Sequence, residues 1–227
     1  VTDVDFGAKD ATPGEMQSVG TYGTLTLGAT GSYTYTPNDV ADTLDTGESV
    51  TEIFTYTVSD PDGTTAVSTL TITVTGVNDA PIAEDNSYET TQFDAIGGNV
   101  ILDDGNGALP GGVDRDVDDT TAELKVTQVN GVDLVFDAGT GDATVNLTHG
   151  VLTISEDGEF SYQPDGSDFT GAVSFSYSIE DPEGDASSAI VSITIGNQGP
   201  TARPDEINVD EDSSGTVNPL TSDTDPD

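Results

Sequence analysis

The sequence has no cysteine, no tryptophan and a single histidine, and it has only four basic side chains in 227 residues. Without cysteine, disulfide bonds cannot form the framework of the fold. A secreted protein without disulfide bonds needs another source of stability, and a bound metal ion is the obvious candidate. The lone imidazole, His149, excludes zinc clusters and triads built on several histidines, and we interpret it as a turn residue before a strand. No run of 18 apolar residues occurs, so we expect no membrane insertion.

Acidic side chains outnumber basic ones by 43 to 4, which gives a formal net charge of −39 at pH 7. Such a chain repels phosphate groups, so neither nucleic acid nor an anionic membrane surface is an expected partner. The same charge makes a compact state repel itself. Long β-branched runs separated by regular turn signals distinguish the sequence from a disordered acidic segment and indicate an all-β fold.

Two blocks of the sequence occur twice. YGTLTLGATGSYTYTP at 22–37 matches HGVLTISEDGEFSYQP at 149–164, and IFTYTVSDPDGTTAVSTLTITV at 53–74 matches SFSYSIEDPEGDASSAIVSITI at 174–195. Apolar and polar residues alternate in each block, and Asp-Pro-acid-Gly supplies a turn, so each block is predicted to form a β-hairpin. The Asn130–Gly131 step predicts a further hairpin. Short alternating strands of this kind are typical of an antiparallel β-sandwich.

The aromatic residues of these blocks lie at strand spacing, so we expect them in the core rather than in a binding site. They are Tyr33, Tyr35, Tyr56, Phe160, Tyr162, Phe175 and Tyr177.

The matches divide the chain into three parts. The segment from Pro200, PTARPDEINVDED, resembles PIAEDNSYETTQ, which opens the second copy at Pro81. The first residues, VTDVDFG, look like the continuation of such an opening segment. We therefore predict a repeat without its first strand at 1–78, a complete repeat at 79–198, and the opening segment of a third repeat at 199–227.

The hairpin and linker FTYTVSDPDGTTAVSTLTITVTGVNDAP, at 54–81, resemble the VCBS-type and cadherin-like repeats of very large bacterial surface adhesins, many with RTX-type export signals. FSYSIEDPEGDASSAIVSITI at 175–195 and LTSDTDPD at 220–227 resemble the same group. The resemblance implies tandem immunoglobulin/cadherin-like antiparallel β-sandwiches, Ca²⁺ at or near their junctions, and a role in spacing or surface attachment. The glycine-rich nonapeptide of RTX calcium β-rolls is absent.

Acids cluster in DRDVDD at 114–119 and in SDTDPD at 222–227. Two carboxylates about 4 Å apart repel by about 4 kcal/mol at an effective dielectric near 20, so such groups either splay into water or surround a cation. Ca²⁺ takes roughly six to eight oxygen ligands, which these loops offer. From the acid spacing and the resemblance together, the candidate metal ligands are Asp3, Asp5, Asp60, Asp62, Asn78, Asp79, Asp85, Asp114, Asp116, Asp118, Asp181, Glu183, Asp223, Asp225 and Asp227.

These features predict an extracellular, calcium-rigidified spacer of a bacterial cell-surface adhesin, active in cell adhesion and biofilm and without a catalytic role. In this reading, ions fix the angles between neighbouring repeats of the same polypeptide. The alternative is a carbohydrate- or protein-binding module with an unknown surface ligand, which an exposed aromatic cluster beside a calcium site would favour. A hydrolase would need a carboxylate pair in a deep cleft.

The two ends raise a further hypothesis. An unpaired sheet edge in the first repeat would invite strand addition. The tail at 200–227 of one molecule would then complete the first repeat of another, head to tail, and build filaments. The plain alternative is a tail that packs nearby or stays disordered.

Overall fold

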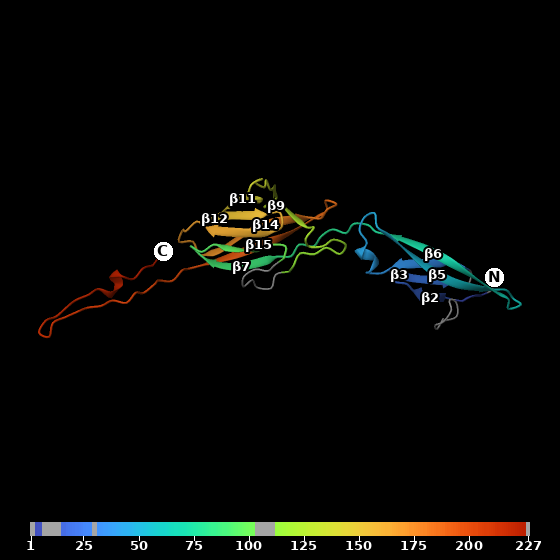
Figure 1. Cartoon of the computed structure of the whole chain (residues 1–227), viewed down its shortest axis with the longest axis horizontal. Helices are drawn as coiled ribbons and strands as arrows, with labels where there is room; N and C mark the ends of the chain where they lie inside the picture. The colour runs from blue at the N-terminus through green and yellow to red at the C-terminus, as the bar shows by residue number, and fades with distance from the viewer. Residues whose placement is uncertain (1–2, 6–14, 29–30, 103–111, 226–227) are drawn as a thin grey trace. The chain divides into compact units, whose positions relative to one another are not determined.

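The computed structural model describes residues 3–5, 15–28, 31–102 and 112–225, which consist of β-strands and their connections with two short 3₁₀ turns (Figure 1). The chain forms two compact units, Val1–Ala80 with Asp116–Thr120, and Pro81–Arg115 with Thr121–Asp227. The predicted all-β class of tandem immunoglobulin/cadherin-like sandwiches is confirmed. Within the described ranges, no helix has the length and apolarity needed to cross a bilayer.

The second unit packs a five-stranded sheet, in the order β10-β9-β14-β15-β7, against a four-stranded sheet, in the order β11-β12-β13-β8. Its strands are β7 (Asn86–Thr91), β8 (Ile96–Asn99), β9 (Lys125–Val129), β10 (Val132–Asp133), β11 (Asp142–Leu147), β12 (Gly150–Ser155), β13 (Glu159–Pro164), β14 (Gly171–Glu180) and β15 (Ala186–Gly196). Among these pairs only β7 and β15 run parallel. A parallel pair needs a long connection, and the rest of the sandwich supplies it.

Strict alternation places every second side chain of the central strands in the core of the second unit. In β14 the buried positions are Val173, Phe175, Tyr177 and Ile179, while their neighbours face outward. The predicted core aromatics of this repeat are confirmed as buried, because none is more than 4% exposed: Phe160, Tyr162, Phe175 and Tyr177.

The predicted hairpins are confirmed by the pairing of their strands. β14 pairs with β15 from Gly171↔Ile195 to Glu180↔Ala186, around the Asp-Pro-Glu-Gly turn. Gly184 has φ of 95°, a conformation that glycine adopts without a steric penalty. Asn130 (φ 52°) and Gly131 (φ 72°) join β9 to β10 in the two-residue turn expected from their sequence.

The first unit contains two three-stranded sheets, β1-β5-β6 and β2-β3-β4. Its elements are β1 (Asp3–Asp5), β2 (Glu15–Val19), β3 (Gly23–Gly28), β4 (Tyr33–Pro37), the 3₁₀ turn η1 (Ala41–Thr43), β5 (Ser49–Ser59) and β6 (Thr65–Thr75). Its buried apolar side chains are fewer than those of the second unit among the described residues: Leu25, Leu27, Ala41, Leu44 and Phe54.

Tyr33 departs from the prediction, because it is 55% exposed rather than part of the core. Its counterpart in the second repeat, Phe160, packs edge-on against Tyr88 of β7, with ring centroids 4.9 Å apart. Among its described residues, the first unit has no strand paired with β6 as β7 pairs with β15. The aromatic position is therefore repeated, but the described part of the first unit holds no counterpart of the strand that covers it in the second.

Glu52 of β5 binds the turn that precedes β3. Its carboxylate accepts hydrogen bonds from the amides of Thr21 and Tyr22, the latter at 3.0 Å, and from the Tyr35 hydroxyl at 2.6 Å. Partial burial alone would raise the pKa of Glu52, but the hydrogen bonds outweigh it and hold the pKa below its usual value. Burial and the Glu52 carboxylate raise the pKa of Tyr35 to about 12.

The segment from Gly199 to Asp225 is extended and mostly exposed, and it folds back on itself. Thr201 and Thr224 form an isolated antiparallel bridge, and Asp223 accepts a hydrogen bond from the Arg203 amide at 2.8 Å. A single 3₁₀ turn, η2 (Pro219–Thr221), lies between them. Strand exchange through 200–227 and the division at 78 and 198 stay predictions.

Replacing Glu52 by Gln should destabilise the first unit by about 1–3 kcal/mol at pH 7, because an amide removes the charge that these donors bind. The pKa of Glu52 is lower in the folded chain than its unfolded value of 4.5. The stabilisation that the Glu52 carboxylate gives is therefore fully present above the unfolded pKa, and it is lost as the pH falls through the folded pKa. The difference in the free energy of unfolding between wild type and Glu52→Gln should therefore become smaller at acidic pH. Amide hydrogen exchange at Thr21 and Tyr22 measures the loss of stability at this turn.

Glu48→Gln, at an exposed position of the same unit, is the matched control. If Glu52→Gln left exchange at the two amides as slow as in the control, the carboxylate would not hold this turn.

Candidate metal centre

A five-residue segment from the second repeat, Asp116–Thr120, belongs to the first compact unit. It carries three of the clustered acids, Asp116, Asp118 and Asp119, and all three side chains are partly buried. Carboxylate oxygens of Asp116 and Asp119 lie within 4.8 Å of one another, as do those of Asp119 and Asp45. Acids far apart in the sequence are therefore gathered in one place within this unit.

Backbone amides of the linker after β6 donate hydrogen bonds to this segment and to the turn before β5. The Asp79 amide donates a hydrogen bond to Asp118 Oδ2 at 3.0 Å, and the Asn78 amide donates to Thr46 Oγ1 at 3.0 Å. Gly76 lies so close to the turn before β5 that a Cβ there would stand 2.2 Å from the carbonyl oxygen of Asp45. A glycine is thus required for the linker to approach this turn.

The carboxylates of this segment are partly removed from water. Asp116 Oδ2 and Asp118 Oδ1 are buried and receive no hydrogen bond from the part of the chain that the structure describes. Burial, with the adjacent Asp118 carboxyl adding to it, raises the pKa of Asp116 to about 6. The nearby basic residue, Arg115, pairs instead with Glu84 at 2.9 Å.

These groups fit a hard cation. The clustered groups among the described residues are carboxylates, and neither histidine nitrogen nor cysteine sulfur stands among them. Ca²⁺ binds such oxygens in flexible geometry, whereas Zn²⁺ in structural sites takes cysteine and histidine. Of the predicted ligands, the structure brings Asp79, Asp116 and Asp118 together and places Asn78 beside them.

Sequence reasoning did not assign Asp45 or Asp119 as ligands. Asp119 stands in the DRDVDD cluster, so its spacing already carried the signal. Asp45 lies in an Asp-Thr-Gly turn that resembles many surface turns, and its proximity to a segment some seventy positions later appears only in the folded chain.

Two predicted ligands cap their own turns. Asp60 Oδ1 accepts hydrogen bonds from the amides of Asp62 and Thr64, at 3.0 and 2.9 Å. In the second repeat, Asp181 Oδ1 accepts from the amides of Gly184 and Asp185, at 2.7 and 2.8 Å. These aspartates stabilise the hairpins as side-chain acceptors in turns do.

The remaining predicted ligands are spread over both units. Asp85 Oδ1 accepts from the Ile190 amide at 2.8 Å, and Asp223 binds the Arg203 amide. Asp3 and Asp5 lie in β1, opposite Ser59 and Thr57 of β5. Asp62, Glu183 and Asp225 are exposed, and Asp227 lies outside the described residues.

Asp114 is completely buried in the second unit. Its carboxylate lies within hydrogen-bond distance of the Tyr177 hydroxyl, at 2.9 and 3.0 Å, and accepts from the Glu84 amide at 2.8 Å. Burial and the Asp114 carboxylate raise the pKa of Tyr177, so the phenol stays protonated as the donor. This contact ties the end of the acidic loop to the core strand β14.

Tandem sandwiches with a cluster of carboxylates beside their linker define a cadherin-like repeat protein. The sequence matches the family described as the bacterial cadherin-like domain over residues 1–76 and 78–196. The chain therefore belongs to the bacterial cadherin-like domain family.

One relative is the calcium-binding lectin RapA2 of Rhizobium johnstonii. The two sequences are 31% identical over 198 residues, which covers 83% of this chain and 78% of that protein.

Solved structures with a similar fold include cadherin ectodomains. Extracellular cadherin domains 1–5 of protocadherin gamma B2 match with 14% identity and a TM-score of 0.39, over 89% of this chain and 37% of that one. Domains EC1–4 of Drosophila N-cadherin match with 14% identity and a TM-score of 0.40, over 86% of this chain and 45% of that one. The chain thus spans less than half the length of these two structures.

Replacing Tyr177 by Phe should lower the free energy of unfolding of the second unit by about 1–3 kcal/mol, because buried Asp114 loses a hydrogen-bond donor. Tyr33→Phe removes the same hydroxyl from an exposed ring and should change stability by less than about 0.5 kcal/mol. Chemical denaturation in EDTA compares the two variants with wild type. Equal stability of the two variants would show that the Tyr177–Asp114 contact does not stabilise the unit.

Proposed function

We propose that the chain is a pair of calcium-stiffened repeats from a bacterial surface adhesion protein, with a binding and spacing role rather than a catalytic one. The observation that carries the proposal is the acidic segment 116–120, where Asp116 Oδ2 and Asp118 Oδ1 are buried and receive no hydrogen bond from the described chain. The relative named as a calcium-binding lectin supports Ca²⁺ as the cation.

Calcium would supply the positive charge that this segment lacks. Asp116, Asp118 and Asp119 would offer carboxylates from a single loop, and Asp45 would offer one from the turn before β5. The Asp79 amide already binds Asp118, so part of the loop is organised in advance. Because the segment continues into the second repeat at both ends, an ion that fixes it within the first unit would restrict motion of the linker near residue 80.

Calcium titration tests this proposal. Extracellular calcium modules bind with dissociation constants of roughly 10⁻⁴–10⁻³ M, and calcium at ten times the constant adds about 1.4 kcal/mol to the free energy of unfolding. We expect Asp118→Asn and Asp116→Asn each to weaken calcium affinity by about tenfold or more, measured by calorimetry and by thermal unfolding. Small-angle scattering should show a narrower range of conformations for wild type in calcium than in EDTA.

Asp39→Asn, at an exposed aspartate of the same unit, makes the same change of charge and serves as the control. It should retain the calcium response of wild type. Identical calcium responses of Asp118→Asn and Asp39→Asn would count against this segment as the site.

A second candidate function is saccharide binding. It is favoured by the relative described as a lectin, with which this chain shares 31% identity over 83% of its length. In that case the calcium-stiffened repeats would present a sugar site on their surface. A printed array of neutral and acidic glycans, probed with the whole chain in millimolar calcium, tests this function. Retention of at least one glycan is the expected result, and retention of none in calcium overturns it.

A further inference from the structure

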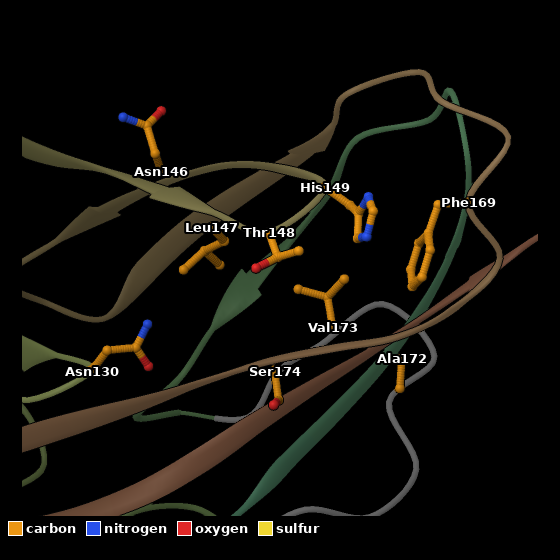
Figure 2. Close-up of a pocket in the computed structure, with 9 residues that line it drawn as sticks. All are labelled: Asn130, Asn146, Leu147, Thr148, His149, Phe169, Ala172, Val173 and Ser174. Atoms are coloured by element: carbon orange, nitrogen blue, oxygen red, sulfur yellow. The ribbon is translucent and has the colours of Figure 1, made fainter.

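A pocket of about 490 Å³ opens on one end of the second unit (Figure 2). This volume falls within the range of about 300–1,000 Å³ that is usual for small-molecule sites. Its lining combines an aromatic pair with amide and hydroxyl side chains: Asn130, Asn146, Thr148, His149, Phe169 and Ser174. None of these side chains carries a permanent charge.

The aromatic pair is formed by residues from separate loops. The His149 and Phe169 rings are stacked, with centroids 3.8 Å apart and planes within 5° of parallel. His149 occupies the turn between β11 and β12 with φ of 65°, and its carbonyl accepts hydrogen bonds from the Tyr162 hydroxyl at 2.8 Å and the Asp165 amide at 3.0 Å. The backbone beneath the imidazole is therefore held in place, which suits a preorganised site.

The polar groups are also set on ordered backbone. Asn130 is fixed by the hairpin turn, and its Oδ1 accepts from the Ser176 amide at 3.0 Å, so its NH₂ group is left to donate elsewhere. Thr148 and Ser174 add hydroxyls that both donate and accept, and both are exposed. Together these groups match the rim of hydroxyls on a sugar ring, and the aromatic pair matches its apolar C–H face.

In the first repeat, the corresponding turn is bound by the side chain of Glu52. Glu52 pairs with Ile72 in β5–β6 as Val173 pairs with Ile193 in β14–β15, so Val173 is the counterpart of Glu52. In the first repeat the Glu52 carboxylate binds the amides of Thr21 and Tyr22, which correspond to Thr148 and His149. In the second repeat a short apolar Val173 stands there, and the pocket stays open. The contact that Glu52 makes with this turn is thus not repeated by Val173 in the second copy.

Charge decides between neutral and anionic ligands. The chain carries a net charge of −39, and Oδ2 of Asp165 lies 3.9 Å from Nδ1 of His149, which lines the pocket. An acidic sugar would meet repulsion from this surface, whereas a neutral sugar would not. We propose that the pocket binds a neutral hexose unit of a polysaccharide, an assignment that rests on the saccharide-binding function proposed above.

The only histidine of the sequence makes the test direct, because the imidazole resonances of wild type belong to His149 alone. A neutral oligosaccharide retained by the array is titrated into the whole chain in calcium. The expected result is a saturable shift of the imidazole resonances, with a midpoint equal to the dissociation constant from calorimetry. Phe169→Ala should weaken binding by about tenfold or more, and Val173→Glu, which copies the first repeat, should abolish it.

Tyr33→Ala removes an exposed aromatic ring from the first unit and is the matched control, expected to bind as wild type does. Phe169→Ala keeps the test decisive if Val173→Glu does not fold. A glycan that binds wild type and Phe169→Ala equally, without moving the His149 resonances, overturns this pocket while the saccharide-binding function stands. Retention of acidic glycans alone overturns the neutral-hexose assignment, and retention of none overturns the function itself.

Discussion

Each carboxylate of a folded chain needs a hydrogen-bond donor, a cation or water, and this chain has only four basic side chains for 43 acids. Backbone amides supply much of what is missing. They bind Asp60 and Asp181 in the hairpin turns, Asp85 beside β15, and Glu52 at the turn before β3. Several turns of the sandwiches therefore depend on contacts between anions and amides. At Asp116 and Asp118 the described chain offers one buried oxygen of each carboxylate no such donor, and there the need falls on a cation or on water.

The hairpins, their turns and most of the core of the second unit could be predicted because they follow from short-range patterns. Alternation over β14 and a Gly after Asp-Pro-acid are local signals, and the structure confirms both. The exposure of Tyr33 could not be predicted in this way. It depends on whether a distant strand covers the position, as β7 covers Phe160.

The candidate site was only partly accessible to sequence reasoning, for the same reason. Spacing singled out the loop with Asp116 and Asp118, but it could not separate these acids from Asp114, whose carboxylate lies within hydrogen-bond distance of the Tyr177 hydroxyl in the core. Asp45 joins the cluster only through tertiary folding. The pocket likewise escapes a linear reading, because His149 and Phe169 become stacked only when β12 and β13 bring their ends together.

The two repeats share a fold but differ in the side chain that faces this turn. Glu52 satisfies the turn of the first repeat from within, while Val173 leaves the same turn of the second repeat beside a pocket. A duplicated domain can in this way keep its stability in one copy and expose a surface for recognition in the other.

The first compact unit contains five residues, Asp116–Thr120, that the chain encodes within the next repeat. The compact unit and the segment that matches the family therefore have different boundaries. A recombination event that replaced the second repeat would also replace the acids that stand near Asp45, so the first repeat takes part of its electrostatic environment from the second. In an array built on this plan, neighbouring repeats would be constrained to change together at these positions. The order of the repeats along the chain would then determine which acids stand near each turn.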